Sequence, residues 1–102
     1  MLELRPTCEH CDRALPPEAP EARICSFECT FCADCVDEVL NNVCPNCGGG
    51  FEARPIRPRR NLRGDNDLGH HPASTSVRHR PVDPDRHREF AASIATTAPK
   101  DR

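Results

Sequence analysis

The stretch "CSFECTFCADC", residues 25–35, places four cysteines within eleven residues of the chain. Such a segment is able to form one metal site, half of each of two sites, an iron–sulfur motif or a disulfide knot. The chain contains eight cysteines, and the other four flank this stretch at Cys8, Cys11, Cys44 and Cys47. The way in which the eight cysteines combine therefore decides the fold.

The size of the cysteine-bearing region explains why it needs cross-links. The chain has 102 residues and no Trp or Tyr, and its apolar residues become sparse after Ile56. A block of about fifty residues buries too little apolar surface to offset the entropy lost on folding, unless cross-links or bound metal stabilise it. We therefore expect one small domain, in residues 1–58, that is held together by its cysteines.

The expected cellular compartment indicates what kind of cross-link the cysteines form. The first residues, "MLELRPTCEH", carry charges and lack the apolar run of a signal peptide. No later segment approaches the roughly 18 apolar residues of a membrane span. We therefore expect a cytoplasmic protein with no membrane partner, in which thiols stay reduced and clustered cysteines bind metal. A disulfide framework remains the alternative, and iron remains an alternative to zinc.

The cysteines form four closely spaced pairs, which suit two metal ions with four thiolates each. In chain order the pairs are Cys8/Cys11, Cys25/Cys29, Cys32/Cys35 and Cys44/Cys47. A sequential grouping joins the first pair with the second, a nested grouping joins the first with the fourth, and a crossed grouping joins the first with the third. The nested grouping asks one short segment to surround an ion while it also forms a hairpin and begins a helix, so it is disfavoured.

Local patterns favour the crossed grouping over the sequential one. Residues 23–31 alternate in a way that predicts a short β-hairpin, and residues 33–41 carry a helical apolar stripe. The stripe consists of Val36, Val39 and Leu40. Cysteines at a helix start benefit from the helix dipole, and in the crossed arrangement one small core with Phe27 and Phe31 serves both sites.

The order of the cysteine gaps resembles the cross-brace of RING-type and treble-clef zinc domains, and "CPNC" resembles the sequence that closes many of them. This resemblance implies a small α+β domain with a hairpin and one helix, stabilised by two zinc ions. It implies two ligand sets: Cys8, Cys11, Cys32 and Cys35 in site one, and Cys25, Cys29, Cys44 and Cys47 in site two. Cys29 stands where RING domains usually have a histidine.

The features by which RING ubiquitin ligases recognise their conjugating enzymes are missing from this chain. Glu9 and His10 occupy the first knuckle where an apolar residue is usual, and Gly48 follows the last cysteine where many ligases have a basic residue. Two closed tetrathiolate sites also leave no open coordination position for catalysis. We therefore expect neither ligase activity nor catalytic residues, and no small-molecule substrate or organic cofactor.

The chain is also similar to a small bacterial family of uncharacterised, short, cysteine-rich proteins. Four segments carry this resemblance, which covers roughly residues 2–58: "LELRP", "ICSFECTFC", "CPNCGG" and "RPIRP". It implies a small zinc-binding domain and no established activity.

Residues 59–102 differ in composition from the cysteine-rich part. They are rich in Pro, Arg and His, so we expect a mostly disordered tail with a short helix at 84–97, capped by Asp83. Residues 1–52 carry a net charge of −7 and residues 53–102 a net charge of +5. Two zinc ions held by eight thiolates would take the acidic part to about −11.

These observations predict a structural zinc-binding adaptor that contacts a protein partner. Two alternatives are a regulator that binds nucleic acid through the arginines of the tail, and a redox sensor that acts through its thiols and zinc.

Overall fold

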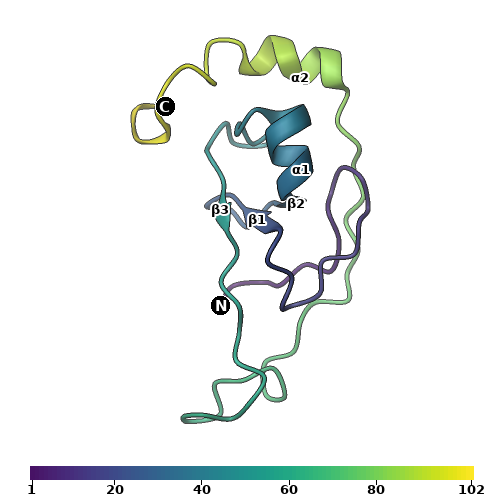
Figure 1. Ribbon diagram of the computed structural model, residues 1–102, viewed down its shortest axis with the longest axis vertical. Coiled ribbons are helices and arrows are strands. Elements are labelled where there is room, and N and C mark those ends of the chain that lie inside the picture. Colours follow the sequence, from purple (N-terminus) through teal and green to yellow (C-terminus); the bar gives the residue numbers. More distant parts are fainter.

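A β-hairpin lies at the centre of the molecule in the computed structural model, which describes residues 1–102 (Figure 1). Strand β1 (Ala22–Ile24) pairs antiparallel with β2 (Thr30–Cys32), in the region where the alternating pattern predicts a hairpin. A short strand, β3 (Glu52–Ala53), pairs antiparallel with the other edge of β1 and completes a sheet in the order β2-β1-β3. The hairpin therefore connects the N-terminal loops with the segment that follows the last cysteine.

A short helix follows β2 without a connecting loop. Helix α1 (Ala33–Cys35) continues directly into the π-helical turn η1 (Val36–Leu40), and Asn41 ends it with a left-handed φ of 51°. Val36 and Leu40 are buried, and Val39 packs against the core from its edge. The helix thus covers the region predicted from the apolar stripe, and its apolar side faces the core.

The core contains Phe31, but Phe27 lies outside it. The ring of Phe31 is 1 % exposed and meets the ring of Phe51 edge-on, with 5.5 Å between the centroids. Phe27 is 70 % exposed, so the prediction that it shares the core is wrong. The reason is local: Phe27 lies in the hairpin loop between Cys25 and Cys29, and the backbone there turns its side chain to solvent.

Two buried arginines connect loops to the hairpin and the strands. Arg5 pairs with Glu9 at 2.9 Å, and the same Glu9 oxygen accepts the backbone N–H of Thr30 in β2. Arg54 is 4 % exposed and donates to three backbone carbonyls, those of Arg5, Leu15 and Pro16. Because these charged groups are bonded inside the molecule, they fix the N-terminal segment against the sheet.

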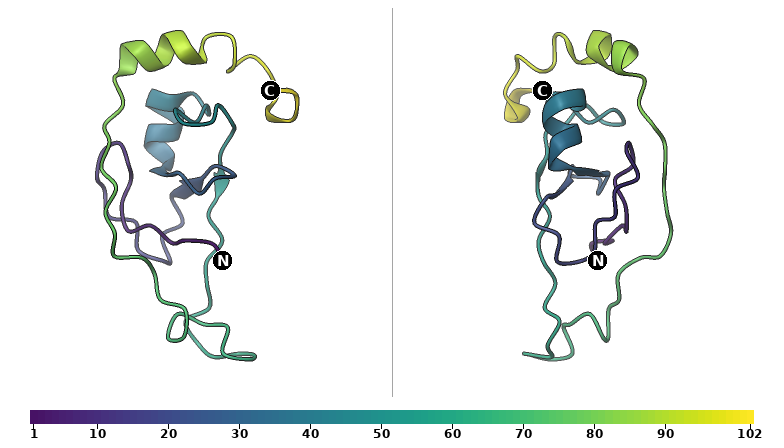
Figure 2. Two further views of the ribbon diagram at one scale, coloured as in Figure 1. Left: turned by 180° about the vertical axis from the view of Figure 1, so that it is seen from behind. Right: turned by 45° about the vertical axis from the view of Figure 1, so that its right-hand side comes forward.

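The tail packs along the outside of the cysteine-rich part, contrary to the expectation that it is mostly disordered. After a loop at the far end, the chain returns beside the N-terminal segment and crosses over the helix (Figure 2). The backbone N–H of Ser74 bonds to the carbonyl of Leu4, and that of Arg80 to the carbonyl of Glu9. Composition alone did not indicate this packing, because it depends on backbone hydrogen bonds rather than on burial of large apolar side chains.

The last part of the tail forms helix α2 (Pro84–Ala91), which lies over η1. The Asp83 side chain caps its start by accepting from the backbone N–H groups of Asp85 and Arg86. The helix is shorter than the 84–97 expected, and turns follow it up to η2 (Pro99–Asp101). The hydroxyl groups of Thr96 and Thr97 both donate to the Ser93 carbonyl, and the Thr97 N–H bonds to the Ile94 carbonyl in a tight turn instead of to Ser93.

Candidate metal centre

Two of the cysteine pairs lie in backbone turns of the same construction. In the first turn, the Asp12 N–H bonds to the Cys8 carbonyl and the Cys8 N–H to the Arg13 carbonyl. In the last turn, the Gly48 N–H bonds to the Cys44 carbonyl and the Cys44 N–H to the Gly49 carbonyl. Asp12 and Gly48 hold the equivalent left-handed position, with φ of 64° and 78°. Each turn presents its two cysteines toward the same side, as a zinc knuckle requires.

The first cysteine group brings together all four residues of the expected site one. The sulfur atoms of Cys8, Cys11, Cys32 and Cys35 lie within 4.8 Å of one another. Cys32 ends β2 and Cys35 ends α1, so the hairpin and the helix place one pair opposite the first knuckle. Only Cys11 is exposed, and its sulfur lies 3.8 Å from that of Cys32.

The second cysteine group brings together three of the four residues expected in site two. The sulfurs of Cys25, Cys44 and Cys47 lie within 4.8 Å of one another, and Cys29 is not part of this set. The Cys29 sulfur instead accepts a hydrogen bond from the Asn46 side-chain amide at 3.3 Å. A cysteine side chain is short, so the turn of the hairpin backbone at Glu28, which has φ of 69°, decides where this sulfur points.

Hydrogen bonds from N–H groups to sulfur surround the second group. The backbone N–H groups of Phe27, Asn46 and Gly49 point at the sulfurs of Cys25, Cys44 and Cys47, at 3.3, 3.5 and 3.4 Å respectively. Such donors stabilise negative charge on sulfur and orient the ligands of a metal. The residues between and after the cysteines therefore prepare the group for thiolates.

The protonation of the thiols follows from their burial. Burial raises the pKa of Cys25 to about 11, and it also raises the pKa values of Cys35 and Cys44. At Cys11 burial opposes ionisation, but hydrogen bonds from the Arg13 backbone and from neighbouring thiols lower the pKa below its ordinary value. A metal ion that binds these groups must therefore displace protons from the buried sulfurs.

The donor set of the first group fits zinc. Four thiolates at about 2.3 Å from a tetrahedral ion lie about 3.8 Å apart, which is the separation found between Cys11 and Cys32. Soft sulfur ligands select zinc, copper(I) or iron–sulfur chemistry over magnesium and calcium. In the second group, three sulfurs are in place, and Cys29 is the remaining cysteine of the hairpin loop beside them.

Several residues that support the groups were not identified from the sequence. Glu9 was considered only as a substitute for an apolar residue, yet its carboxylate joins the first knuckle to β2 through Thr30. Asn46 was not singled out, yet its side-chain amide donates to the Cys29 sulfur. An acid or amide inside a Cys-x2-Cys turn was the available signal, but its partner lies elsewhere in the fold.

The fold and the site define a small α+β protein with two cysteine groups, each able to hold a metal ion. The chain belongs to the family described as "Protein of unknown function (DUF1272)", whose model matches residues 1–57. An uncharacterised protein of Rhizobium meliloti (strain 1021) is 53 % identical over 76 residues, which cover 74 % of this chain and 83 % of the relative. No solved structure matches the chain significantly.

The helices do not include a candidate membrane span, because none is long and apolar enough to cross a bilayer.

Proposed function

We propose that this chain is a structural zinc-binding adaptor with two zinc ions, which stabilise a module that contacts a protein partner. The observation that carries the proposal is the convergence of four sulfurs, from Cys8, Cys11, Cys32 and Cys35, on one point between two segments of the chain. Four sulfurs around one ion leave no position for a catalytic water, which favours a structural role.

In this proposal the two ions are held in a RING-like cross-brace. The first and third cysteine pairs hold one ion, and the second and fourth pairs hold the other, with Cys29 completing the second set. The residues of the hairpin and the helix would then be fixed at both ends by metal. This arrangement explains how so small a core holds a fold, since metal binding supplies folding free energy.

The experiment is native mass spectrometry of the purified chain with elemental analysis, before and after removal of metal in acid. We expect two zinc ions per chain, displacement of thiol protons, and loss of structure by circular dichroism when the metal is removed. Ser26→Ala, in the hairpin loop between two cysteines, is the control and keeps both ions. A chain without metal and with oxidised thiols would reject the proposal.

A second candidate function is redox sensing, which one observation favours. Each group has one exposed cysteine, Cys11 in the first and Cys47 in the second. Exposed thiolates are the ones that peroxide reaches. If this function holds, peroxide at low concentration releases zinc reversibly, and thiol reductant restores it. Zinc that stays bound under peroxide would exclude sensing and leave the structural role.

A further inference from the structure

The basic loop, residues 57–71, closes the end of the molecule that lies opposite helix α2 (Figure 1). The Leu68 N–H bonds to the Pro58 carbonyl, which brings the two sides of the loop together. The Arg57 guanidinium donates to the carbonyls of His71 and Leu2, at 2.7 and 2.8 Å. The loop is therefore anchored to the N-terminal segment and presents a defined surface.

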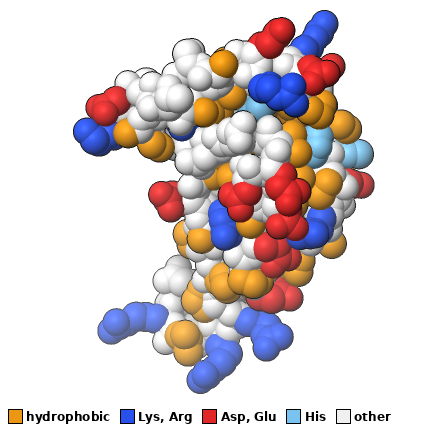
Figure 3. Space-filling model, turned by 45° about the horizontal axis from the view of Figure 1, so that its top comes forward, with side chains coloured by type: hydrophobic (Ala, Val, Ile, Leu, Met, Phe, Trp, Pro, Cys, Tyr) orange, Lys and Arg blue, Asp and Glu red, His pale blue; other side chains and the backbone are white.

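Three exposed arginines project from this loop. Arg59, Arg60 and Arg63 are exposed, and their guanidinium groups make no hydrogen bond or ion pair. Other arginines, such as Arg5 and Arg54, are buried and bonded. In the space-filling view, basic side chains project from the lower end around apolar atoms, and acidic side chains gather on the body above (Figure 3). The end of the molecule thus carries unpaired positive charge.

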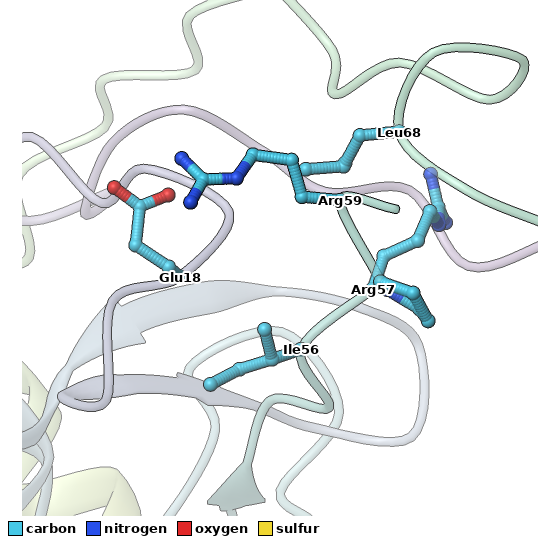
Figure 4. A pocket seen from close by; sticks show the side chains of 6 residues that line it. Glu18, Ile56, Arg57, Arg59 and Leu68 are labelled. Atoms are coloured by element: carbon cyan, nitrogen blue, oxygen red, sulfur yellow. The ribbon is translucent and has the colours of Figure 1, made fainter. Parts of the chain in front are cut away.

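A small pocket lies beside these arginines. It has a volume of about 290 Å³ and is lined by Glu18, Ile56, Arg57, Pro58, Arg59 and Leu68. The Glu18 carboxylate and the Arg59 guanidinium face one another across it, with Ile56 and Leu68 also bordering the space (Figure 4). This volume is at the lower end of ligand pockets, so it suits one apolar side chain better than a whole small molecule.

We propose that the basic loop and this pocket bind an acidic, extended peptide segment of a partner protein. One apolar side chain of the segment enters the pocket between Ile56 and Leu68, and carboxylates on either side pair with Arg59, Arg60 and Arg63. Arginine suits this role because its planar fork binds carboxylates through two parallel hydrogen bonds. The inference rests on the proposed adaptor function, for which it supplies the chemistry of the partner.

The surroundings of the pocket favour a peptide over nucleic acid. The loop contains no Phe, Tyr or Trp on which bases could stack. The net charge of −7 on residues 1–52 repels a phosphate backbone that continues past the arginines. A short acidic segment is able to stop at the arginines, whereas a long strand would run on over the acidic body.

The test is a titration of the zinc-loaded full chain, labelled with ¹⁵N, with a short polyglutamate peptide that has one central leucine. We expect the amide resonances of Ile56 and of the basic loop to shift, with those of helix α2 unchanged. The double variant Arg59→Glu/Arg60→Glu weakens binding by about tenfold or more, because it replaces attraction by repulsion. Replacing the central leucine of the peptide by serine weakens binding several-fold, since it removes apolar contact.

The matched control is Arg86→Glu/Arg88→Glu, which makes the same change of charge on helix α2. The proposal is overturned if this control weakens binding equally, or if the loop resonances stay fixed at saturating peptide. It is also overturned if single-stranded DNA of equal charge shifts the same resonances at lower concentration. Zinc content is measured on each sample, so that a failure of the unmutated chain to bind the peptide while it retains two zinc ions rejects this inference alone.

Discussion

The two cysteine groups share one hairpin and one helix, but their sulfurs are arranged differently. In the first group, four sulfurs lie within 4.8 Å of one another; in the second group, three do. The pairs of the first group both have the Cys-x2-Cys spacing, whereas the second group includes Cys25-x3-Cys29. The hairpin backbone takes a left-handed turn at Glu28, and the Cys29 sulfur accepts from the Asn46 amide while it lies outside the set of three sulfurs.

This difference shows that cysteine spacing indicates which pairs come together, but not where each sulfur points. The order and spacing of the cysteines indicate which pairs lie close in the fold. The direction of each short side chain depends on the backbone turn that carries it and on the donors around it. We therefore expect the first group to be the stronger metal site and the second to depend on rearrangement at Cys29.

The largest expected effect comes from removing a sulfur of the first group. Cys8→Ser should abolish binding of one zinc ion and unfold the first knuckle, because structural zinc contributes about 10–16 kcal/mol to the folding of small zinc domains. Cys29→Ser should keep the fold and weaken only the second ion. Native mass spectrometry and circular dichroism measure both. Equal loss in the two variants would show that Cys29 is as firm a ligand as Cys8.

The next effect concerns the ion pair that anchors the first group to the sheet. Glu9→Gln removes one of the two carboxylates that pair with the buried Arg5 guanidinium, while Glu3 still pairs with it at 2.9 Å, so the loss should be about 1–3 kcal/mol. Urea unfolding of the zinc-loaded chain measures the loss. Glu38→Gln, on the exposed side of the helix, is the control and should change stability by less than about 0.5 kcal/mol. A similar stability for both variants would contradict the anchoring role.

The dependence on pH distinguishes two individual cysteines, Cys25 and Cys11, in the metal-free chain. The pKa of Cys25 in the second group is raised from 9.0 to about 11, so its proton favours the folded state below pH 9. This contribution is lost as the pH rises to about 11. The pKa of Cys11 in the first group is lowered, so its ionised form contributes with the opposite sign.

We therefore expect Cys25→Ser to reduce the alkaline loss of residual structure and Cys11→Ser to increase it. Circular dichroism of the chelator-treated chain across this range measures both. The zinc-loaded chain should instead lose its structure at acidic pH, because protons compete with zinc for the thiolates. The same alkaline profile in both variants would contradict the opposite pKa shifts of Cys25 and Cys11.

The smallest effect concerns helix α2 of the tail, which lies next to the last knuckle, whereas residues 79–82 of the tail contact the first knuckle at Glu9 and His10. The buried His87 ring nitrogen bonds to the Leu40 carbonyl at 2.9 Å. Phe90 and Ile94 lie over Gly48, next to the last cysteine, with side-chain atoms 3.9 and 3.8 Å from where a Cβ would stand. His87→Ala should cost about 1 kcal/mol, loosen helix α2 and speed zinc exchange at the second group.

Amide hydrogen exchange of α2 and exchange of isotopic zinc measure this effect. The exposed Glu89→Ala on the same helix is the control and should leave zinc exchange unchanged. Faster exchange at both groups would show that the tail does not act locally.

Much of the cysteine-rich part was predictable, and the reason is that its signals are local. The hairpin follows from alternation at residues 23–31, and the helix from the stripe at Val36, Val39 and Leu40. Phe27 was misplaced because alternation does not indicate which residues of a hairpin fall in its loop. The packing of the tail was missed because a polar composition does not exclude order when backbone groups find partners.

The sequence by itself determined that eight cysteines in four pairs dominate a chain too small for an ordinary core, and that acidic and basic charges are separated along it. Only the tertiary structure decided that the Cys29 sulfur turns to Asn46, that Glu9 bonds β2, and that His87 reaches the helix end. Spacing along the chain limits which residues are able to meet. Contacts between residues far apart in sequence depend on how the whole backbone packs, because each needs a donor and an acceptor within about 3 Å.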